Sequence, residues 1–279
     1  MCCATCVKSA WLNSATTIQT SEKGNTMNAS RLLSAIAALA AAAALAGCAG
    51  MATHAWEVSP EIRAVVASPD RSDADRKTDE RRKPDMLLAF AGVKPGMKVL
   101  EVGAGAGYSA ELLARSVGPQ GTVYAHNSPD AIARFIKTRF DERAAKPAMA
   151  NVVKLVREFD DPVPGDLRGL DLVTMLYEYH DTPAMGIDRA KMNRRIFDAL
   201  KRGGHFVVAD HAAKAGAGVG VGKTLHRIDE ALVRQEIEAA GFQFVAAADF
   251  LRNPEDTREA TSARATFRVD AFVLKFVKP

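Results

Sequence analysis

Three glycines at alternate positions, Gly103, Gly105 and Gly107, separate an apolar run from a helix-forming segment in the stretch VLEVGAGAGYSAELLA, residues 99–114. Glycine adopts backbone angles that other residues avoid, and it lets the backbone approach a ligand closely. The helix that follows begins with free N–H groups and a positive dipole end. This turn from strand to helix therefore predicts a ligand site at the carboxyl end of a strand in an open parallel sheet.

Apolar runs and helical patterns alternate along the chain from Pro84 onward. The predicted strands lie at residues 97–103, 121–127, 151–159, 170–180, 205–210, 242–251 and 270–279. The predicted helices lie at 109–118, 129–145, 187–204 and 229–242, and one more begins at Pro84. Such alternation gives parallel strands joined by right-handed crossovers, with helices on both faces. The last two strands are joined only by the polar segment 252–268, so we expect them to pair antiparallel at one edge of the sheet.

The part of the chain before Pro84 contains two segments that differ in composition. Arg31 precedes a run of small and apolar residues, 32–46, that ends in the sequence LAGC at Cys48. This pattern predicts a secretory signal, because the run is too short to cross a bilayer. The following residues, 51–83, are polar and rich in both charges, and there we expect a short helix at 61–67 and then a solvated linker or cap.

The LAGC sequence resembles the lipobox of bacterial lipoproteins, which implies that Cys48 carries a lipid anchor. The resemblance implies a location in the cell envelope, facing the periplasm, with Met27 as the start and residues 1–26 an over-long start. An alanine-rich helix that happens to end in Gly-Cys is the other interpretation, and an unused signal would leave the protein in the cytoplasm. All four cysteines lie at or before Cys48, which excludes disulfides and thiolate chemistry from the rest of the chain.

The balance of charge argues against a nucleic-acid partner. The chain has 37 Lys and Arg against 33 Asp and Glu, a net charge of +4, with no block of like charges. Proteins that depend on phosphate contacts usually carry a stronger basic bias.

The glycine spacing also differs from that of dinucleotide-binding proteins. Tyr108 stands where the G-x-G-x-x-G fingerprint needs its last glycine. Glu101, two residues before the first glycine, would repel a pyrophosphate, and this disfavours a nicotinamide-dependent oxidoreductase. An acid there suits a ligand with a cationic head, such as the amine and sulfonium of S-adenosylmethionine.

The segment PGMKVLEVGAGAGYSAELLA, residues 95–114, resembles the first motif of the class I S-adenosylmethionine-dependent methyltransferases, and residues 84–279 follow that family's order of elements. The chain also resembles a group of bacterial predicted methyltransferases with YHD, DH and LHRID segments. Here these segments are Tyr179-His180-Asp181, Asp210-His211 and Leu225-His226-Arg227-Ile228-Asp229. The first motif is similar to that of protein-isoaspartate methyltransferases as well. The resemblance implies a three-layer α/β Rossmann-like sandwich, with a mostly parallel seven-stranded sheet and an antiparallel closing hairpin.

The same resemblance implies S-adenosylmethionine as the cofactor and assigns residues to it. Glu101, Gly103, Gly105 and Gly107 match the motif that lines the methionine part. Family members often place an acid at the end of the second strand to bind the ribose hydroxyls, but this sequence has His126-Asn127, so Asn127 is the expected ribose contact. Asp160 or Asp161 fits the position that contacts the adenine amine, although a loop acid that caps a turn is an equal interpretation.

Candidate catalytic residues gather where the fourth and fifth strands end. His180 is the expected base because its ordinary pKa lies near neutrality, and His211 and Asp181 are further catalytic candidates. A hydrogen-bonded structural histidine is the alternative role for His180, and His226 is a weaker candidate for the base. No HxH or HxxxH spacing supports a metal site, so we expect none.

Other aromatic and loop residues have two interpretations each. Tyr108 and Tyr177 either face the sulfonium or pack as ordinary aromatics. The glycine-rich stretch 212–223 is either a lid over the substrate or a plain loop.

Together the patterns predict four segments: 1–26, the over-long start; 27–48, the signal peptide with its lipobox; 49–83, the polar extension; and 84–279, the methyltransferase-like domain. The expected acceptor is a small molecule. Because S-adenosylmethionine is made in the cytoplasm and the N-terminus predicts export, the alternative is a non-catalytic, envelope-anchored ligand-binding lipoprotein on a methyltransferase scaffold.

Overall fold

Seven strands form one sheet in the order β3-β2-β1-β4-β5-β7-β6 in the computed structural model, which describes residues 56–279. The strands are β1 (Lys98–Val102), β2 (Thr122–Asn127), β3 (Val152–Val156), β4 (Leu170–Leu176), β5 (Leu200–His211), β6 (Gln243–Ala248) and β7 (Ala271–Val277). β1 to β5 pair in parallel, and β7 lies antiparallel between β5 and β6. The predicted α/β fold, with its antiparallel closing hairpin, is confirmed.

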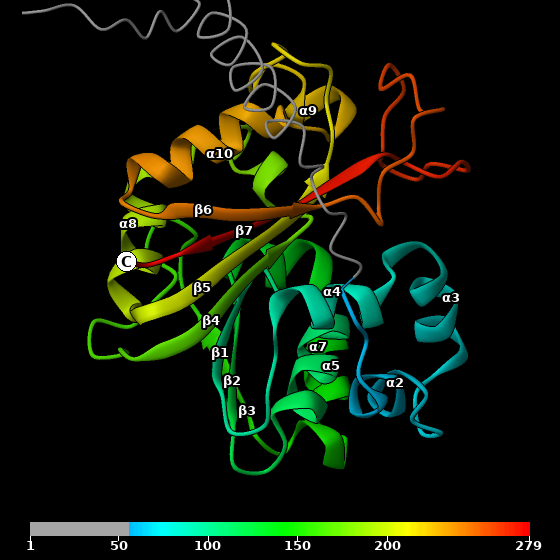
Figure 1. Ribbon diagram of the computed structural model, residues 1–279, viewed down its shortest axis with the longest axis vertical. Coiled ribbons are helices and arrows are strands. Elements are labelled where there is room, and N and C mark those ends of the chain that lie inside the picture. The colour runs from blue at the N-terminus through cyan, green and yellow to red at the C-terminus, as the bar shows by residue number, and fades with distance from the viewer. Residues whose placement is uncertain (1–55) are drawn as a thin grey trace, which may run out of the picture. The chain divides into compact units, whose positions relative to one another are not determined.

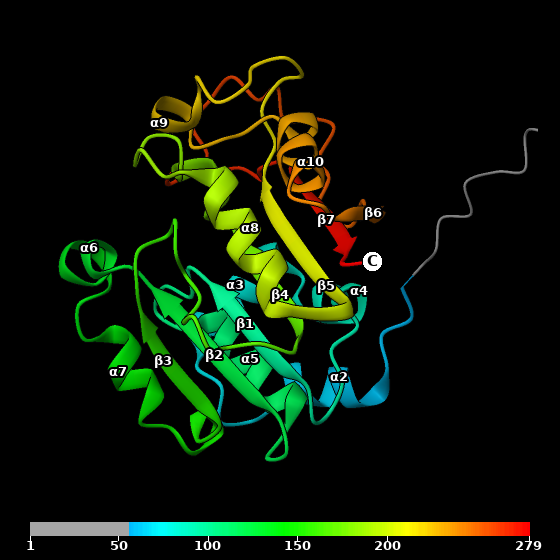
Figure 2. The same ribbon diagram turned by 90° about the vertical axis from the view of Figure 1, so that its left-hand side faces the viewer.

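Helices cover both faces of the sheet (Figures 1 and 2). One face carries α4 (Pro84–Ala91), α5 (Tyr108–Val117) and α7 (Arg139–Ala144), and the other carries α8 (Arg189–Ala199) and α10 (Glu230–Ala239). α2 (Pro60–Val66) packs against α4 and α5, and α3 (Asp73–Arg82) follows it. Short elements complete the order: α6 (Pro129–Ala131), η2 (Ile132–Ile136), η3 (Pro147–Met149), η4 (Tyr179–Asp181) and α9 (Gly222–Leu225).

β1 lies inside the sheet, between β2 and β4, and it is buried from Val99 onward. Its side chains alternate between the two faces: Val99 packs in the cluster under α4 and α5, and Leu100 and Val102 pack in the cluster under α8 and α10. An interior parallel strand with both faces covered requires such a continuous apolar run. Glu101 interrupts this run on the α5 face, so the acid lies inside the protein.

Two predicted helices have different bounds in the structure. The segment predicted as one helix, 129–145, divides into α6, the π-helix η2 and α7, because Lys137 adopts a positive φ of 52° that interrupts the helical ladder. The helix predicted over 187–204 ends at Ala199, and its two terminal glycines lie within β5. A Cβ on Gly204 would lie 2.9 Å from the carbonyl oxygen of Lys201, so only glycine fits where this strand enters the sheet.

Of the two alternatives expected after the first short helix, a solvated linker or a cap, the linker was wrong, because residues 73–82 form α3. Ser72 caps the helix by accepting a hydrogen bond from the N–H of Asp75, and acids occupy the first turn. Arg81 and Arg82 lie in the last turn, where cations stabilise the negative end of the helix dipole. The mixed charge of this segment thus suits a capped helix.

The predicted signal, lipobox and Cys48 lie outside the described residues. Between residues 56 and 279, no helix combines the length and apolar character that crossing a membrane requires.

Candidate active site

The glycine loop connects β1 to α5, and its three glycines all have positive φ. Gly107 is the N-cap of α5, and a Cβ there would lie 3.0 Å from Cδ of Arg143 and 3.2 Å from the ring of Phe140. Arg143 also donates from Nε to the carbonyl oxygen of Ala106, at 2.9 Å. The loop is thus packed closely from the α7 side, and its conformation requires glycine.

The end of β2 fixes the other side of the loop. Asn127 accepts from the N–H of Gly105 at 2.8 Å and donates to the carbonyl oxygen of Gly105 at 3.0 Å. His126 accepts from the N–H of Gly103 at 3.4 Å and contacts the carbonyl oxygen of Arg157 at 3.0 Å. Burial lowers the pKa of His126 to about 4, so the ring is neutral and makes both contacts. Asn127 therefore holds the glycine loop, and a ribose contact through it would have to share the same two atoms.

The two acids after β3 both form ion pairs in the structure. Asp160 contacts Lys191 at 3.0 Å, and Asp161 contacts Arg195 at 2.5 Å and also pairs with Arg157. These pairs connect the loop to α8. The adenine contact expected of Asp160 or Asp161 stays a prediction.

Glu101 is a buried carboxyl without a cation in contact with it. One oxygen bonds to Ser109, and Oε2 has no hydrogen-bond partner. Burial raises the pKa of Glu101 to about 8, although the Ser109 bond and the Arg82 charge act in the opposite direction. A buried acid with a free oxygen beside a glycine loop fits the cationic amine of S-adenosylmethionine, which would supply the missing partner.

Glu178, which the sequence analysis missed, lies over the same loop. A Cβ on Gly103 would be only 2.4 Å from Cγ of Glu178, so the two are in close contact. Burial raises the pKa of Glu178 to about 8, and the charge of Asp181 adds to this rise. The only signal in the sequence was its place two residues after β4, directly before the YHD segment. Buried Glu101 and half-buried Glu178 therefore flank the loop, and a cation bound there would favour the charged form of both carboxyls.

Arg82 is a second residue that the sequence analysis missed. Its guanidinium lies 4.4 Å from the ring centre of Tyr177 and 5.5 Å from that of Tyr108. These two tyrosines and Arg82 line a nearly filled apolar pocket of about 20 Å³ against α4 and α5. One interpretation of the sequence was that both tyrosines face the sulfonium of the cofactor. In the structure, both rings contact a cation of the protein itself, the guanidinium of Arg82.

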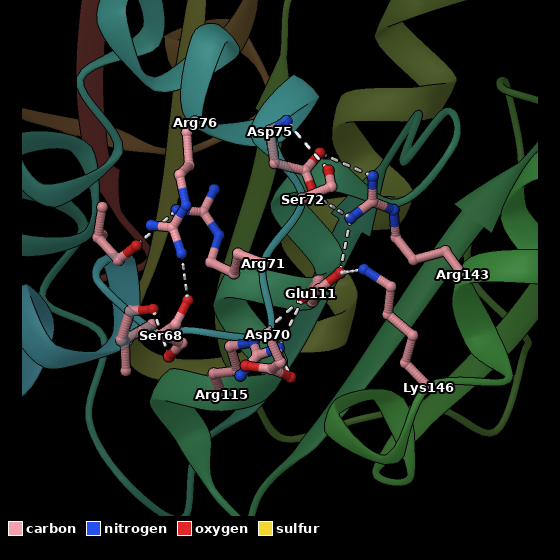
Figure 3. Close-up of polar contacts among 12 residues, drawn as sticks. Ser68, Asp70, Arg71, Ser72, Asp75, Arg76, Glu111, Arg115, Arg143 and Lys146 are labelled. Carbon is pink, nitrogen blue, oxygen red and sulfur yellow. Dashed lines mark hydrogen bonds and ion pairs between the residues drawn. The ribbon is translucent and has the colours of Figure 1, made fainter.

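A network of ion pairs holds α3, which carries Arg82, against the site. Arg71 and Asp79 form a bidentate pair with both distances at 2.7 Å, and Tyr108 donates to Asp79 at 2.6 Å. Asp75 pairs with Arg143 at 2.8 Å, as Figure 3 shows. The polar extension before Pro84 therefore forms part of the site's wall.

The same network continues onto α5 through Glu111, whose side chain is 1% exposed (Figure 3). Arg143, Lys146 and Arg115 all contact this carboxylate, at 2.6, 2.9 and 2.8 Å. Although burial opposes ionisation, these three cations lower the pKa of Glu111. The carboxylate thus stays charged and connects α3, α5 and the segment after α7.

His180 forms a buried ion pair at the end of β4. Its Nδ1 lies 2.7 Å from Oδ1 of Asp210, its backbone N–H donates to the other oxygen at 2.8 Å, and its Nε2 lies 3.3 Å from Asp181. Although burial opposes the charge, the carboxylates of Asp210, Asp181 and Glu178 raise the pKa of His180 to about 9. A ring that is already protonated at neutral pH is a poor proton acceptor, so the geometry disfavours His180 as the base.

His211 has the opposite charge state at the end of β5. Burial lowers its pKa to about 4, and the charges of His180 and Arg82 add to this effect. Its Nδ1 has no hydrogen-bond partner, and its ring lies 5.0 Å from that of Tyr177. Together with Tyr177 it lines a cavity of about 380 Å³. Of the two predicted histidines, His211 is the one that presents a neutral ring to a space large enough for a small molecule.

Two groups of three residues place metal-capable atoms within 4.8 Å of one another: His180 with Asp210 and His211, and His180 with Asp181 and His226. Both groups contain an ion pair of His180, with Asp210 at 2.7 Å and with Asp181 at 3.3 Å, and these pairs form without a metal. The expected absence of a metal stays a prediction, as does a lid role for 212–223.

One family model, described as "Methyltransferase domain", matches residues 93–247. A protein-L-isoaspartate O-methyltransferase of Methanosarcina mazei is 28% identical over 123 residues, 44% of this chain and 44% of the relative. Fibrillarin 3 of Arabidopsis thaliana, named as an rRNA 2′-O-methyltransferase, is 25% identical over 155 residues, 53% of this chain and 50% of the relative. The chain thus matches half or less of the length of these two relatives.

A solved structure from Aquifex aeolicus, described as a SAM dependent methyltransferase, is similar in fold. It superposes with a TM-score of 0.54 at 20% identity, over 75% of this chain and all of that chain. This likeness confirms the architecture of the sheet and helices.

Proposed function

The chain belongs to the methyltransferase domain family, and we propose that it is an S-adenosylmethionine-dependent methyltransferase that methylates a small-molecule acceptor in the cavity beside His211. The observation that carries this proposal is that the neutral ring of His211 lines that cavity, while its buried Nδ1 has no hydrogen-bond partner. Tyr177 lines this cavity, and the next residue, Glu178, packs against Gly103 of the glycine loop, so the proposed donor and acceptor sites are neighbours.

The chain's own residues then have distinct roles. When bound, S-adenosylmethionine supplies an electrophilic methyl group on a sulfonium. Glu101 and Glu178 would hold the cationic part of the donor, and the glycine loop would admit it closely. His211 would accept the proton that the acceptor oxygen or nitrogen loses as it is methylated. Asp210 would fix the backbone that carries this ring, because its Oδ1 accepts from the backbone N–H of His211 at 2.7 Å.

Methyl transfer to fractionated cell extract tests this function. The full-length protein is incubated with methyl-labelled donor and an extract separated by ultrafiltration into small molecules and macromolecules. Label should enter the small-molecule fraction. The His211→Asn variant should lower the rate by about 100-fold or more, as expected for loss of a general base, and still bind S-adenosylhomocysteine. Label in RNA or protein alone would contradict the proposal, since the relatives named above act on such acceptors.

We also propose, from residues 31–48 alone, that the protein is an envelope lipoprotein anchored through Cys48. An envelope location raises the question of how the protein obtains S-adenosylmethionine, which is made in the cytoplasm. Labelled palmitate should be incorporated into the full-length protein in bacterial cells and not into its Cys48→Ser variant. Equal labelling of both, or of neither, would contradict the anchor.

A further inference from the structure

Three arginines surround the cavity beside His211. Arg81 comes from the end of α3, and Arg264 and Arg268 come from the segment 252–270 that joins β6 to β7. Figure 1 shows this orange-red segment on the same side of the molecule as α3. No aspartate or glutamate of the described chain lines the cavity. The wall is therefore strongly cationic, although the net charge of the whole chain is only +4.

The charges of these arginines are not balanced within residues 56–279. The side chains of Arg81 and Arg264 make neither a hydrogen bond nor an ion pair there, and the side chain of Arg268 donates only to backbone carbonyls. The neighbouring arginines of the same segment differ, because they pair with carboxylates. Unpaired arginines that converge on one cavity favour an anion inside it, since a guanidinium binds carboxylate or phosphate in two-pronged fashion.

The segment that carries Arg264 and Arg268 is held in place by bonds to the LHRID segment, residues 225–229. Arg227 is completely buried, pairs with Asp256 at 2.9 Å and donates to the carbonyl oxygen of Ala260 at 2.9 Å. Ser262 donates to the carbonyl oxygen of His226 at 2.5 Å. These bonds come from the LHRID segment, whose Arg227 thus serves as the anchor. The backbone that carries Arg264 and Arg268 is therefore held in place, so only the arginine side chains need to become ordered when an anion binds.

The rest of the cavity indicates the kind of anion. Tyr177, Leu251 and Phe267 provide apolar surface, and about 380 Å³ is the size of a small-ligand pocket. A nucleic-acid strand instead needs a row of cations along an open groove. The cavity therefore suits one small molecule with an apolar body and one anionic group.

We propose that the methyl acceptor carries a carboxylate or phosphate group, which Arg81 and Arg264 bind while the apolar part lies against Tyr177 and Phe267. This inference rests on the proposed function, because it takes the cavity beside His211 as the acceptor site. The anionic group fixes one end of the acceptor, so that its nucleophilic end is directed toward His211.

Binding of matched probes to the full-length protein, saturated with S-adenosylhomocysteine, tests the inference. The probes are 4-hydroxybenzoate, phenyl phosphate and the neutral 4-hydroxybenzamide, with affinities measured by ligand-observed NMR. At least one anion should bind about tenfold more tightly than the amide, and Arg264→Gln and Arg81→Gln should each remove most of this difference. The better anion identifies carboxylate or phosphate as the preferred group. Arg168→Gln is the matched control, because that exposed side chain bonds only to its neighbour's carbonyl.

The outcomes distinguish failure of the anionic acceptor from failure of the proposed methyltransferase function. Equal or absent binding of all three probes, or unchanged selectivity in Arg264→Gln, would overturn the anionic acceptor while the donor still binds. Tighter binding of a single-stranded RNA that depends on Arg264 and resists competition by both anions would replace it with a nucleic-acid acceptor. Failure of S-adenosylhomocysteine to bind the folded wild-type protein would instead overturn the proposed function.

Discussion

Three neighbouring side chains, His180, Asp210 and His211, show how local contacts set opposite charge states. Asp210 uses both oxygens on His180 and on the N–H of His211. The pKa of His180 rises to about 9, and the pKa of His211 falls to about 4. The reference pKa of histidine is the same for both rings, so it could not predict which of them is protonated at neutral pH. The protonation states depend on which ring pairs with the buried carboxylate of Asp210.

The raised pKa of His180 predicts how stability depends on pH. The folded state binds this proton more tightly than the unfolded state, so the stabilisation is complete below pH 6.5 and is lost as the pH rises through about 9. The shift corresponds to a free energy on the order of 3 kcal/mol. Urea unfolding at pH 6 and pH 9.5 should therefore show a stability gap between wild type and His180→Asn that shrinks by about this amount at the higher pH. An equal gap at both pH values would show that His180 is not charged in the folded protein.

At the scale of elements, the site combines parts that are distant along the chain. β1 and its loop provide Glu101 and the glycines, the ends of β4 and β5 provide the histidines, and α3 closes the site with Arg82. The sequence correctly predicted that these residues gather at one edge of the sheet, because parallel strands place their carboxyl ends there. The predicted fourth strand, 170–180, was too long, since β4 ends at Leu176 and His180 lies in η4. It missed α3, whose stability depends on the buried Arg71–Asp79 pair.

Removing one partner of this pair should destabilise the protein. The Arg71 side chain is 1% exposed, so Asp79→Asn leaves a buried cation without its counter-charge, at a cost of about 3 kcal/mol or more. Hydrogen exchange in residues 73–82 should become faster. Glu80→Gln on the same helix is the control, because its pair with Lys77 is exposed and contributes about 0.5 kcal/mol or less. An equal loss of stability in Asp79→Asn and Glu80→Gln would contradict the conclusion that the Arg71–Asp79 pair stabilises α3.

At the scale of the whole molecule, the fold was predictable and the charge of the site was not. Alternating apolar runs and the glycine turn define the sheet through local pattern. The acids over the loop and the cationic cavity depend on tertiary placement, since Arg81 and Arg264 are far apart in sequence and meet only because α3 and the segment before β7 lie against the same strand ends. Neither residue belongs to a motif that a single sequence would single out.

The structure bears on where the methyltransferase-like domain begins. The predicted domain begins at residue 84, but α3 before it contributes Arg81 and Arg82 to the two pockets. We therefore propose that residues 56–83 belong functionally with the domain.

Calorimetric titration of S-adenosylhomocysteine into the full-length protein and its Glu101→Gln variant tests the central claim most directly. The wild type should bind with micromolar affinity, because the cationic amine of the ligand would stabilise the charged form of Glu101, whose pKa burial raises to about 8 in the free protein. The variant should lose about tenfold or more of that affinity, as expected for a charge-assisted hydrogen bond, whereas Glu142→Gln in the exposed part of α7 should bind as the wild type does. Equal affinity of the wild type and Glu101→Gln, or no binding to the folded wild type, would contradict the donor site described above.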